Sequence, residues 1–248
     1  MADDVWRPLR IALGLLTRFP IPWRGQSATA RELGDSVLCY PLIGLIIGGA
    51  LAGLAELSRA FATDPGLGAM GLLIAWVWMT GGMHLEGLAD TADGWIGGLG
   101  DRERALAILK DPHSGPFGVM ALVLVLLLKW NLLRVMLMAP PAWEFWLLAP
   151  LLGRAGIVVL FLTLPYARPG GMGATAAAEL SPARGMGVSL LAMALTGWLA
   201  SWWVVIVWSG ALILLHRAWK ARFGGITGDT SGASCELLEI WVLMAGLF

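Results

Sequence analysis

Charged residues are scarce in this sequence, because only 14% of its 248 residues are Asp, Glu, Lys or Arg. An ordinary soluble domain carries about 25% charged residues, so water is not the main solvent of this chain. Hydrophobic residues make up 58% instead, and the 14 tryptophans among them are typical of side chains at membrane interfaces. The scarcity of charge therefore predicts an integral membrane protein.

A net charge and a cysteine framework are also missing. Lys plus Arg and Asp plus Glu both number 17, so no basic surplus indicates a nucleic-acid partner, and we expect none. The two cysteines, Cys39 and Cys235, form neither a CxxC pair nor a disulfide framework. The apolar stretch 11–16 is too short for a cleavable signal. With no internal repeat, we expect a single membrane domain over 1–248.

Long apolar stretches predict an all-α, polytopic bundle of about six to seven transmembrane helices. A membrane helix needs about 20 apolar residues to cross about 30 Å of hydrocarbon. The run 185–215 has no charge and is longer than one span requires, so we expect two short spans that turn near 197–203. The last run, 237–248, is either a short seventh span or an interfacial helix. Four further stretches reach the required length: 36–55, 66–85, 116–138 and 145–165.

The positions of arginine and lysine predict the orientation, because short cytoplasmic loops are enriched in these residues. The N-terminal segment 1–35 carries five arginines, which favours the cytoplasm. Alternation of the spans then places 86–115 and 223–234 on the same side. Both segments contain acidic, glycine-flanked motifs, so the candidate site is expected to face the cytoplasm.

The first acidic motif, 83–94 (MHLEGLADTADG), directly follows the second apolar stretch. If the helix continues, Glu86, Asp90 and Asp93 lie at i, i+4 and i+7 on one helical face. Three neighbouring anions need a counter-charge, and hard oxygen ligands suit Mg²⁺ that bridges to phosphates. The alternative is that the acids mark a solvated helix end, although such an end does not require two glycines among the acids.

The second motif, 223–233 (FGGITGDTSGA), surrounds hydroxyl groups and a carboxylate with glycines. Glycine lets the backbone approach a ligand closely, and N–H groups at the start of a following helix can hold a phosphate. A glycine-rich turn between two helices is an equally weighted alternative for this motif alone. Its expected position on the side of the first motif favours the functional interpretation. We assign Asp229 to the metal, and to phosphate Gly225, Thr227, Gly228, Thr230 and Ser231.

A third polar stretch, 110–118 (KDPHSGPFG), leads into the third span. Asp111 could bind a metal or orient a nucleophile, and Lys110 could neutralise phosphate. An ordinary membrane-entry loop explains the same prolines and glycines equally well.

Ionisable residues within the apolar stretches are costly and therefore candidates for function. Arg154 offers a fork of donors that suits phosphate, or it pairs with a buried carboxylate for structure alone. His84 could act in proton transfer, but a lone histidine at a helix end is more often a hydrogen-bonding neighbour, and the same holds for His113. Lys129 and Arg134 are interpreted as snorkelling or paired cations.

Taken together, these motifs resemble the cobalamin synthase family, also called adenosylcobinamide-GDP ribazoletransferases. The resemblance covers most of the chain, and the two acidic motifs in this order and separation are its specific marks. The family usually has Asp where this chain has Glu86. The marks are 16–22 (LTRFPIP), 40–44 (YPLIG), 81–94, the pattern of Asp111, Gly115 and Gly118, and 225–233.

The resemblance implies the last assembly step of coenzyme B12. A ribose hydroxyl of α-ribazole, or of its 5′-phosphate, would displace GMP from adenosylcobinamide-GDP with Mg²⁺ as the cofactor. It also implies the bacterial cytoplasmic (inner) membrane with lipid as a partner, and leaves a homo-oligomer open. The expected metal ligands are Glu86, Asp90, Asp93 and Asp229, and the expected catalytic acids are Asp90, Asp93 and Asp111.

Two rival functions are weighed against this one. A CDP-alcohol type membrane phosphotransferase also uses an acidic membrane helix, but an Ala-Arg pair usually follows its first Asp-Gly, whereas Asp93-Gly94 precedes Trp95-Ile96. A cation transporter often shows repeats and broken helices at the membrane midplane. The acids here cluster at one surface instead, and the sequence shows no repeat.

Overall fold

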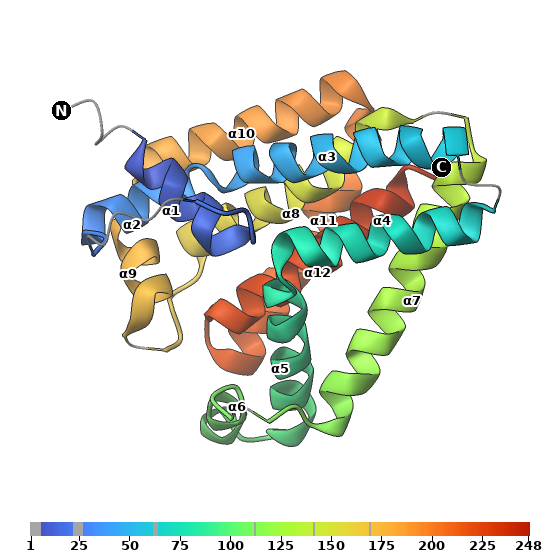
Figure 1. Cartoon of the computed structure of the whole chain (residues 1–248). Helices are drawn as coiled ribbons and strands as arrows, with labels where there is room; N and C mark the ends of the chain where they lie inside the picture. The colour runs from blue at the N-terminus through green and yellow to red at the C-terminus, as the bar shows by residue number, and fades with distance from the viewer. Residues whose placement is uncertain (1–5, 22–26, 62–63, 112, 141, 169) are drawn as a thin grey trace.

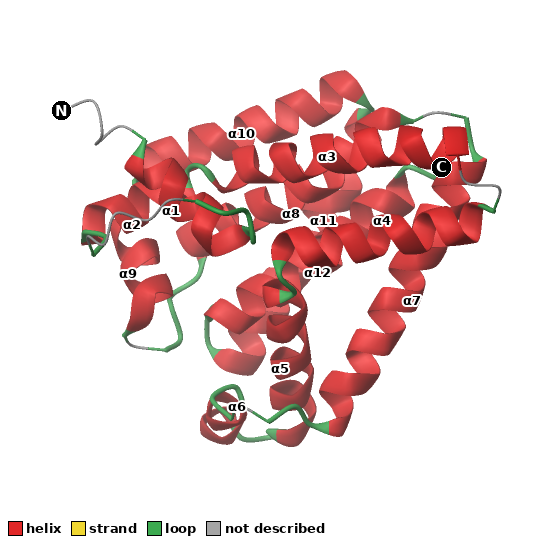
Figure 2. Cartoon of the chain, viewed as in Figure 1, coloured by secondary structure: helices red, strands yellow, loops and turns green. Residues whose placement is uncertain are grey.

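The computed structural model describes residues 6–21, 27–61, 64–111, 113–140, 142–168 and 170–248, and every regular element in these ranges is an α-helix (Figure 2). The all-α class is therefore confirmed. The helices are α1 (Arg7–Leu16), α2 (Ala30–Val37), α3 (Tyr40–Phe61), α4 (Pro65–Thr80), α5 (Met83–Gly97), α6 (Arg102–Ile108), α7 (Pro116–Met138), α8 (Trp143–Thr163), α9 (Gly171–Glu179), α10 (Pro182–Leu199), α11 (Trp202–Phe223) and α12 (Gly228–Ala245).

Four single helices are long and apolar enough to cross a membrane, namely α3, α7, α8 and α11. The helices α4 and α5 pass this test only as a pair, so the described residues contain four or five candidate spans where six to seven were expected. The difference lies in two 18-residue helices that carry charge. Arg184 lowers the hydropathy of α10, and three acidic residues interrupt α12. The final apolar run 237–248 lies mostly within α12, a helix that begins in the second motif.

Two glycines separate the first acidic motif from the preceding helix. Gly81 and Gly82 have φ values of 66° and 70°, a left-handed conformation that glycine adopts without steric cost. Gly81 caps the end of α4, and α5 then leaves at an angle of 88° (Figure 1). The helix therefore does not run on from the apolar stretch, and the three acids lie on a separate helix.

The long uncharged run 185–215 is divided into two helices at the predicted turn, although only the second qualifies as a candidate span. Helix α10 ends at Leu199 and α11 begins at Trp202, with Ala200 in a non-helical conformation between them. The expected turn near 197–203 is confirmed.

Helix α8 lies in the middle of the bundle, with 78% of its most apolar window buried, against 22% for α7. Gly44 and Gly48 of α3 pack directly on its backbone, since a Cβ on either glycine would overlap main-chain atoms of α8. Helix α12 packs against both α8 and α5 (Figure 1). The central helix thus supports α12, which carries the second motif.

Candidate functional site

The two acidic motifs meet where α5 crosses the start of α12. Two glycines permit this approach: a Cβ on Gly87 would lie 2.7 Å from the carbonyl oxygen of Asp229, and one on Gly232 would lie 3.1 Å from Cα of His84. The sequence placed both motifs on one side of the membrane, and the structure brings them into contact. The glycines among the acids are therefore required for helix packing.

Negative charge accumulates at this crossing, outside the four single-helix spans. Burial and then the charges of Asp229, Glu86 and Asp93 raise the pKa of Asp90 to about 6. Burial also raises the pKa of Asp229, while Arg168 opposes both shifts. We call Glu86, Asp90, Asp229 and Arg168 the open acidic cluster, because Glu86 is exposed and the other three are partly exposed.

Arg168 is a site residue that the sequence analysis missed. Its Nη1 atom donates to Oδ2 of Asp229 at 2.6 Å and to the carbonyl oxygen of Leu109 at 3.4 Å. The second contact brings the loop before α7 beside the cluster. Arg168 lies outside both motifs, so local sequence gave no signal for it.

Arg168 is held in this position by a short stretch of extended backbone that pairs with the second motif. The backbone N–H of Ile226 donates to the carbonyl of Pro165 at 2.9 Å, and that of Ala167 donates to the carbonyl of Ile226 at 2.7 Å. A Cβ on Gly225 would overlap the carbonyl oxygen of Pro165. The predicted phosphate residue Gly225 thus serves this close backbone approach.

Asp93 binds the start of α7. Its carboxylate oxygens accept hydrogen bonds from the backbone N–H of Gly115 at 2.7 Å and of Gly118 at 2.9 Å. Helix α7 has no side-chain cap from its own N-cap residue, and Asp93 is only 8% exposed. Both oxygens thus cap the helix end, a role that the sequence did not predict, and the metal and catalytic roles of Asp93 stay predictions.

The hydroxyl groups of the second motif cap α12. Thr227 Oγ1 accepts from the N–H of Thr230, Thr230 Oγ1 accepts from the N–H of Thr227, and both residues are fully buried. Ser231 Oγ donates to the carbonyl of Thr227 at 2.6 Å. The three hydroxyls thus serve the helix cap, and their predicted phosphate roles stay predictions. Gly228 remains open, since a Cβ there would come no closer than 3.7 Å to the Tyr166 hydroxyl.

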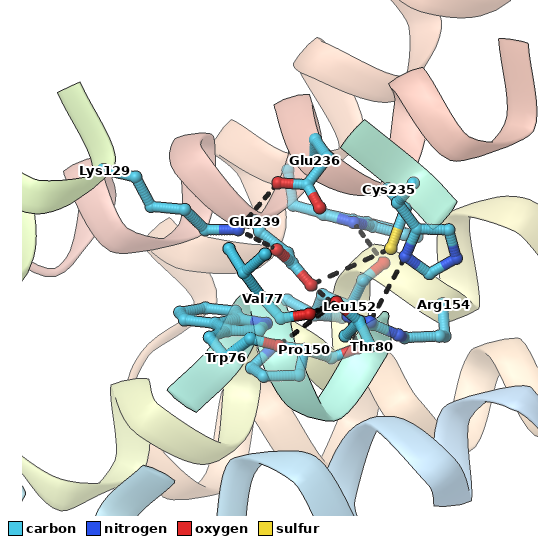
Figure 3. Close-up of polar contacts among 12 residues, drawn as sticks. Trp76, Val77, Thr80, Lys129, Pro150, Leu152, Arg154, Cys235, Glu236 and Glu239 are labelled. Atoms are coloured by element: carbon cyan, nitrogen blue, oxygen red, sulfur yellow. Dashed lines mark hydrogen bonds and ion pairs between the residues drawn. The ribbon is translucent and has the colours of Figure 1, made fainter. Parts of the chain in front are cut away.

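Arg154 lies in a separate, buried ionic network (Figure 3). Its Nη1 donates to Glu239, and Nη2 lies 3.3 Å from Nδ1 of His84. Lys129 Nζ bonds Glu236 at 2.8 Å and also bonds Glu239. Arg154 therefore pairs with a buried carboxylate, the alternative to its predicted phosphate role, and Lys129 is paired as expected. We call Arg154, Lys129, Glu236 and Glu239 the buried ionic network.

Asp111 and Lys110 are both exposed and follow Leu109, whose carbonyl binds Arg168. Asp111 Oδ1 accepts from the backbone N–H of His113 at 3.0 Å and lies 2.7 Å from its Nδ1. These bonds, the backbone one first, lower the pKa of Asp111. A carboxylate with a lowered pKa is a weaker proton acceptor, so this environment disfavours Asp111 as the general base.

The acids of the open acidic cluster fit a metal that is shared with a ligand. In the described part of the chain, no three His, Cys, Asp or Glu side chains converge to hold a metal ion. Mg²⁺ seldom needs such a cage, because it is usually held by one or two carboxylates, waters and substrate phosphates. Glu86 and Asp229, beside the crowded Asp90, provide this smaller donor set.

Comparisons with known proteins agree over nearly the whole chain. Residues 8–247 match the family model described as cobalamin-5-phosphate synthase. Proteins named adenosylcobinamide-GDP ribazoletransferase are similar: those of Pseudomonas paraeruginosa (49% identical, 98% of each chain covered), Pseudomonas aeruginosa (48%, 98% of each) and Pseudomonas putida (47%, 96% of this chain and 97% of the relative). No solved structure matches the chain.

Proposed function

The chain belongs to the cobalamin-5-phosphate synthase family, and from this membership we infer that it is an adenosylcobinamide-GDP ribazoletransferase. The reaction joins adenosylcobinamide-GDP to α-ribazole, or to its 5′-phosphate, and releases GMP. The observation that carries this conclusion is the 49% identity over 98% of both chains to a relative of that name.

We propose that the open acidic cluster binds the diphosphate of the donor with Mg²⁺. Glu86 and Asp229 would hold the ion, which when bound supplies positive charge to the phosphoryl oxygens. Arg168 already pairs with Asp229 at 2.6 Å, and its remaining N–H groups suit a phosphate oxygen. The protein's part in such a transfer is mainly to position groups in line and to neutralise charge.

We propose Asp90 as the acceptor of the proton from the attacking ribose hydroxyl. Its pKa of about 6 keeps it mostly ionised above neutral pH, yet makes it a stronger base than an ordinary aspartate. Of the other predicted catalytic acids, Asp93 caps α7 and Asp111 has a lowered pKa. Asp90 therefore remains the candidate whose environment suits proton transfer.

We propose that the protein lies in the bacterial inner membrane with the open acidic cluster facing the cytoplasm. Four apolar helices and bacterial relatives support the membrane, and the arginines of the N-terminal segment support the orientation. An exposed apolar groove of about 680 Å³ between α4 and α7, lined by residues such as Ile74, Trp78 and Leu127, suits lipid chains.

The test is GMP release by the purified, detergent-solubilised protein given adenosylcobinamide-GDP and α-ribazole. We expect GMP that depends on the acceptor and disappears when a chelator replaces Mg²⁺. Release that persists in the chelator would refute the metal while leaving the transfer intact. A folded sample that releases no GMP would refute the transfer itself.

A further inference from the structure

A cavity of about 230 Å³ lies against Gly228, the neighbour of Asp229 in the open acidic cluster. Apolar side chains line most of it, among them Leu16 of α1, Ile157 and Phe161 of α8, and Ala176 of α9. Helices α1, α2 and α9 gather at one end of the bundle, at the left of Figure 1, and cover the cavity from that side. Its other wall is the start of α12, so one side of the cavity belongs to the second motif.

His84 gives this apolar cavity a hydrogen-bond donor. Nη2 of Arg154 lies 3.3 Å from Nδ1 of His84. A guanidinium group has no acceptor, so Nδ1 must accept and the ring proton must reside on Nε2. His84 lines the cavity and is only 4% exposed, and Nε2 has no hydrogen-bond partner among the described residues. Nε2 is not one of the fully buried polar atoms without a partner, so it is accessible from the cavity and can donate to a ligand that accepts.

The cavity also lies near the carboxylates of the open acidic cluster, where one of the two substrates would react. Gly228 and Ser231 line it on either side of Asp229 along α12. On α5, His84 precedes Asp90 by six residues, which is about 9 Å along a helix. A ligand with an aromatic ring in the cavity could therefore extend a sugar toward the acids.

We propose that this cavity binds the heteroaromatic base of the acceptor nucleoside, with a ring nitrogen accepting from Nε2 of His84. The proposal rests on the proposed function. Ribazole carries a benzimidazole, a flat and largely apolar base with one acceptor nitrogen. Guanine of the donor presents several donors and acceptors that this lining would leave unpaired. The corrinoid is much larger than the cavity. The acceptor's base is thus the part of the substrates that matches both the size and the polarity.

The experiment measures α-ribazole binding to the detergent-solubilised protein by calorimetry. Ala176→Leu fills the cavity from α9, and Met172→Trp adds bulk at its rim, where Met172 is 61% exposed and tolerant of change. The matched control is Ala75→Leu, the same substitution in a separate groove between α3 and α4. A one-ring analogue, imidazole riboside, tests whether the size of the base matters.

We expect both cavity variants to weaken α-ribazole binding at least tenfold and imidazole riboside binding less. The control should bind as the wild type does, and the KM for adenosylcobinamide-GDP should stay unchanged in all variants. Wild-type affinity for α-ribazole in a folded cavity variant, as expected if the cavity only holds a lipid chain, would overturn the proposal. Loss of donor binding instead of acceptor binding would also overturn it. Acceptor-dependent GMP release by the wild type is scored separately, so failure of the proposed function is distinguished from failure of this site.

Discussion

The open acidic cluster and the buried ionic network lie about two turns apart along α12, and both combine carboxylates with arginine. In the buried ionic network two cations face two carboxylates, and all four side chains are at most 4% exposed. In the open acidic cluster three carboxylates accompany Arg168, and mutual repulsion helps to raise the pKa of Asp90. A buried charge must be neutralised within the protein, whereas an excess of accessible negative charge can be neutralised by a bound ligand. The difference therefore separates a structural use of charge from a functional one.

The sharpest test of this contrast is Asp90→Asn in the open acidic cluster. We expect the turnover rate to fall about 1,000-fold, because positioned general bases contribute about 10² to 10⁴ in rate. The melting temperature should not fall, since one of several repelling carboxylates is removed. GMP release and thermal unfolding of the same preparation measure the two quantities. A variant with full turnover would remove Asp90 from the mechanism.

The matching test in the buried ionic network is Glu239→Gln. Glu239 bonds both Arg154 and Lys129, so the change leaves two buried cations with one carboxylate. We expect the free energy of unfolding to fall by about 3 kcal/mol, as breaking a buried ion pair typically costs. Denaturant unfolding in detergent measures this loss, and turnover per folded molecule should decrease far less than in Asp90→Asn. Unchanged stability would show that the network does not hold α12 in place.

Asp93→Asn tests a carboxylate that belongs to the first acidic motif but caps the start of α7. An amide accepts through one oxygen only, so one of the two hydrogen bonds to the start of α7 is lost. We expect a loss of about 1 kcal/mol in stability, the size of a helix-cap deletion, and less than a tenfold loss in turnover. The Mg²⁺ concentration that gives half-maximal GMP release should not change. A large rise in that concentration would show that Asp93 is a metal ligand.

Some features of the fold and of the site could be predicted from the sequence, and others could not. The all-α class and the break near Ala200 followed from composition and from the length of an uncharged run, properties that a chain carries locally. The capping role of Asp93 and the contact of Arg168 with Asp229 depend on partners 22 to 61 residues away. The residue type does not decide the role either. A threonine at position 227 suits both a helix-capping box and a phosphate-binding loop, and only the partner of its hydroxyl distinguishes them.

The smallest expected effect is a pH dependence of stability that belongs to Asp90. Its folded pKa of about 6 lies above the ordinary value of 3.8, so the folded state binds this proton more tightly than the unfolded state. Stability from this group is therefore full below about pH 4 and is lost as the pH rises through 6. Because Asp90 is partly exposed to solvent, we expect a discounted loss of only about 1 kcal/mol. Unfolding of the wild type and of Asp90→Asn without divalent cations, compared at pH 5 and pH 8, measures it. The wild type should lose stability relative to the variant as the pH rises, and a constant difference would mean that Asp90 feels no crowding by its neighbouring carboxylates.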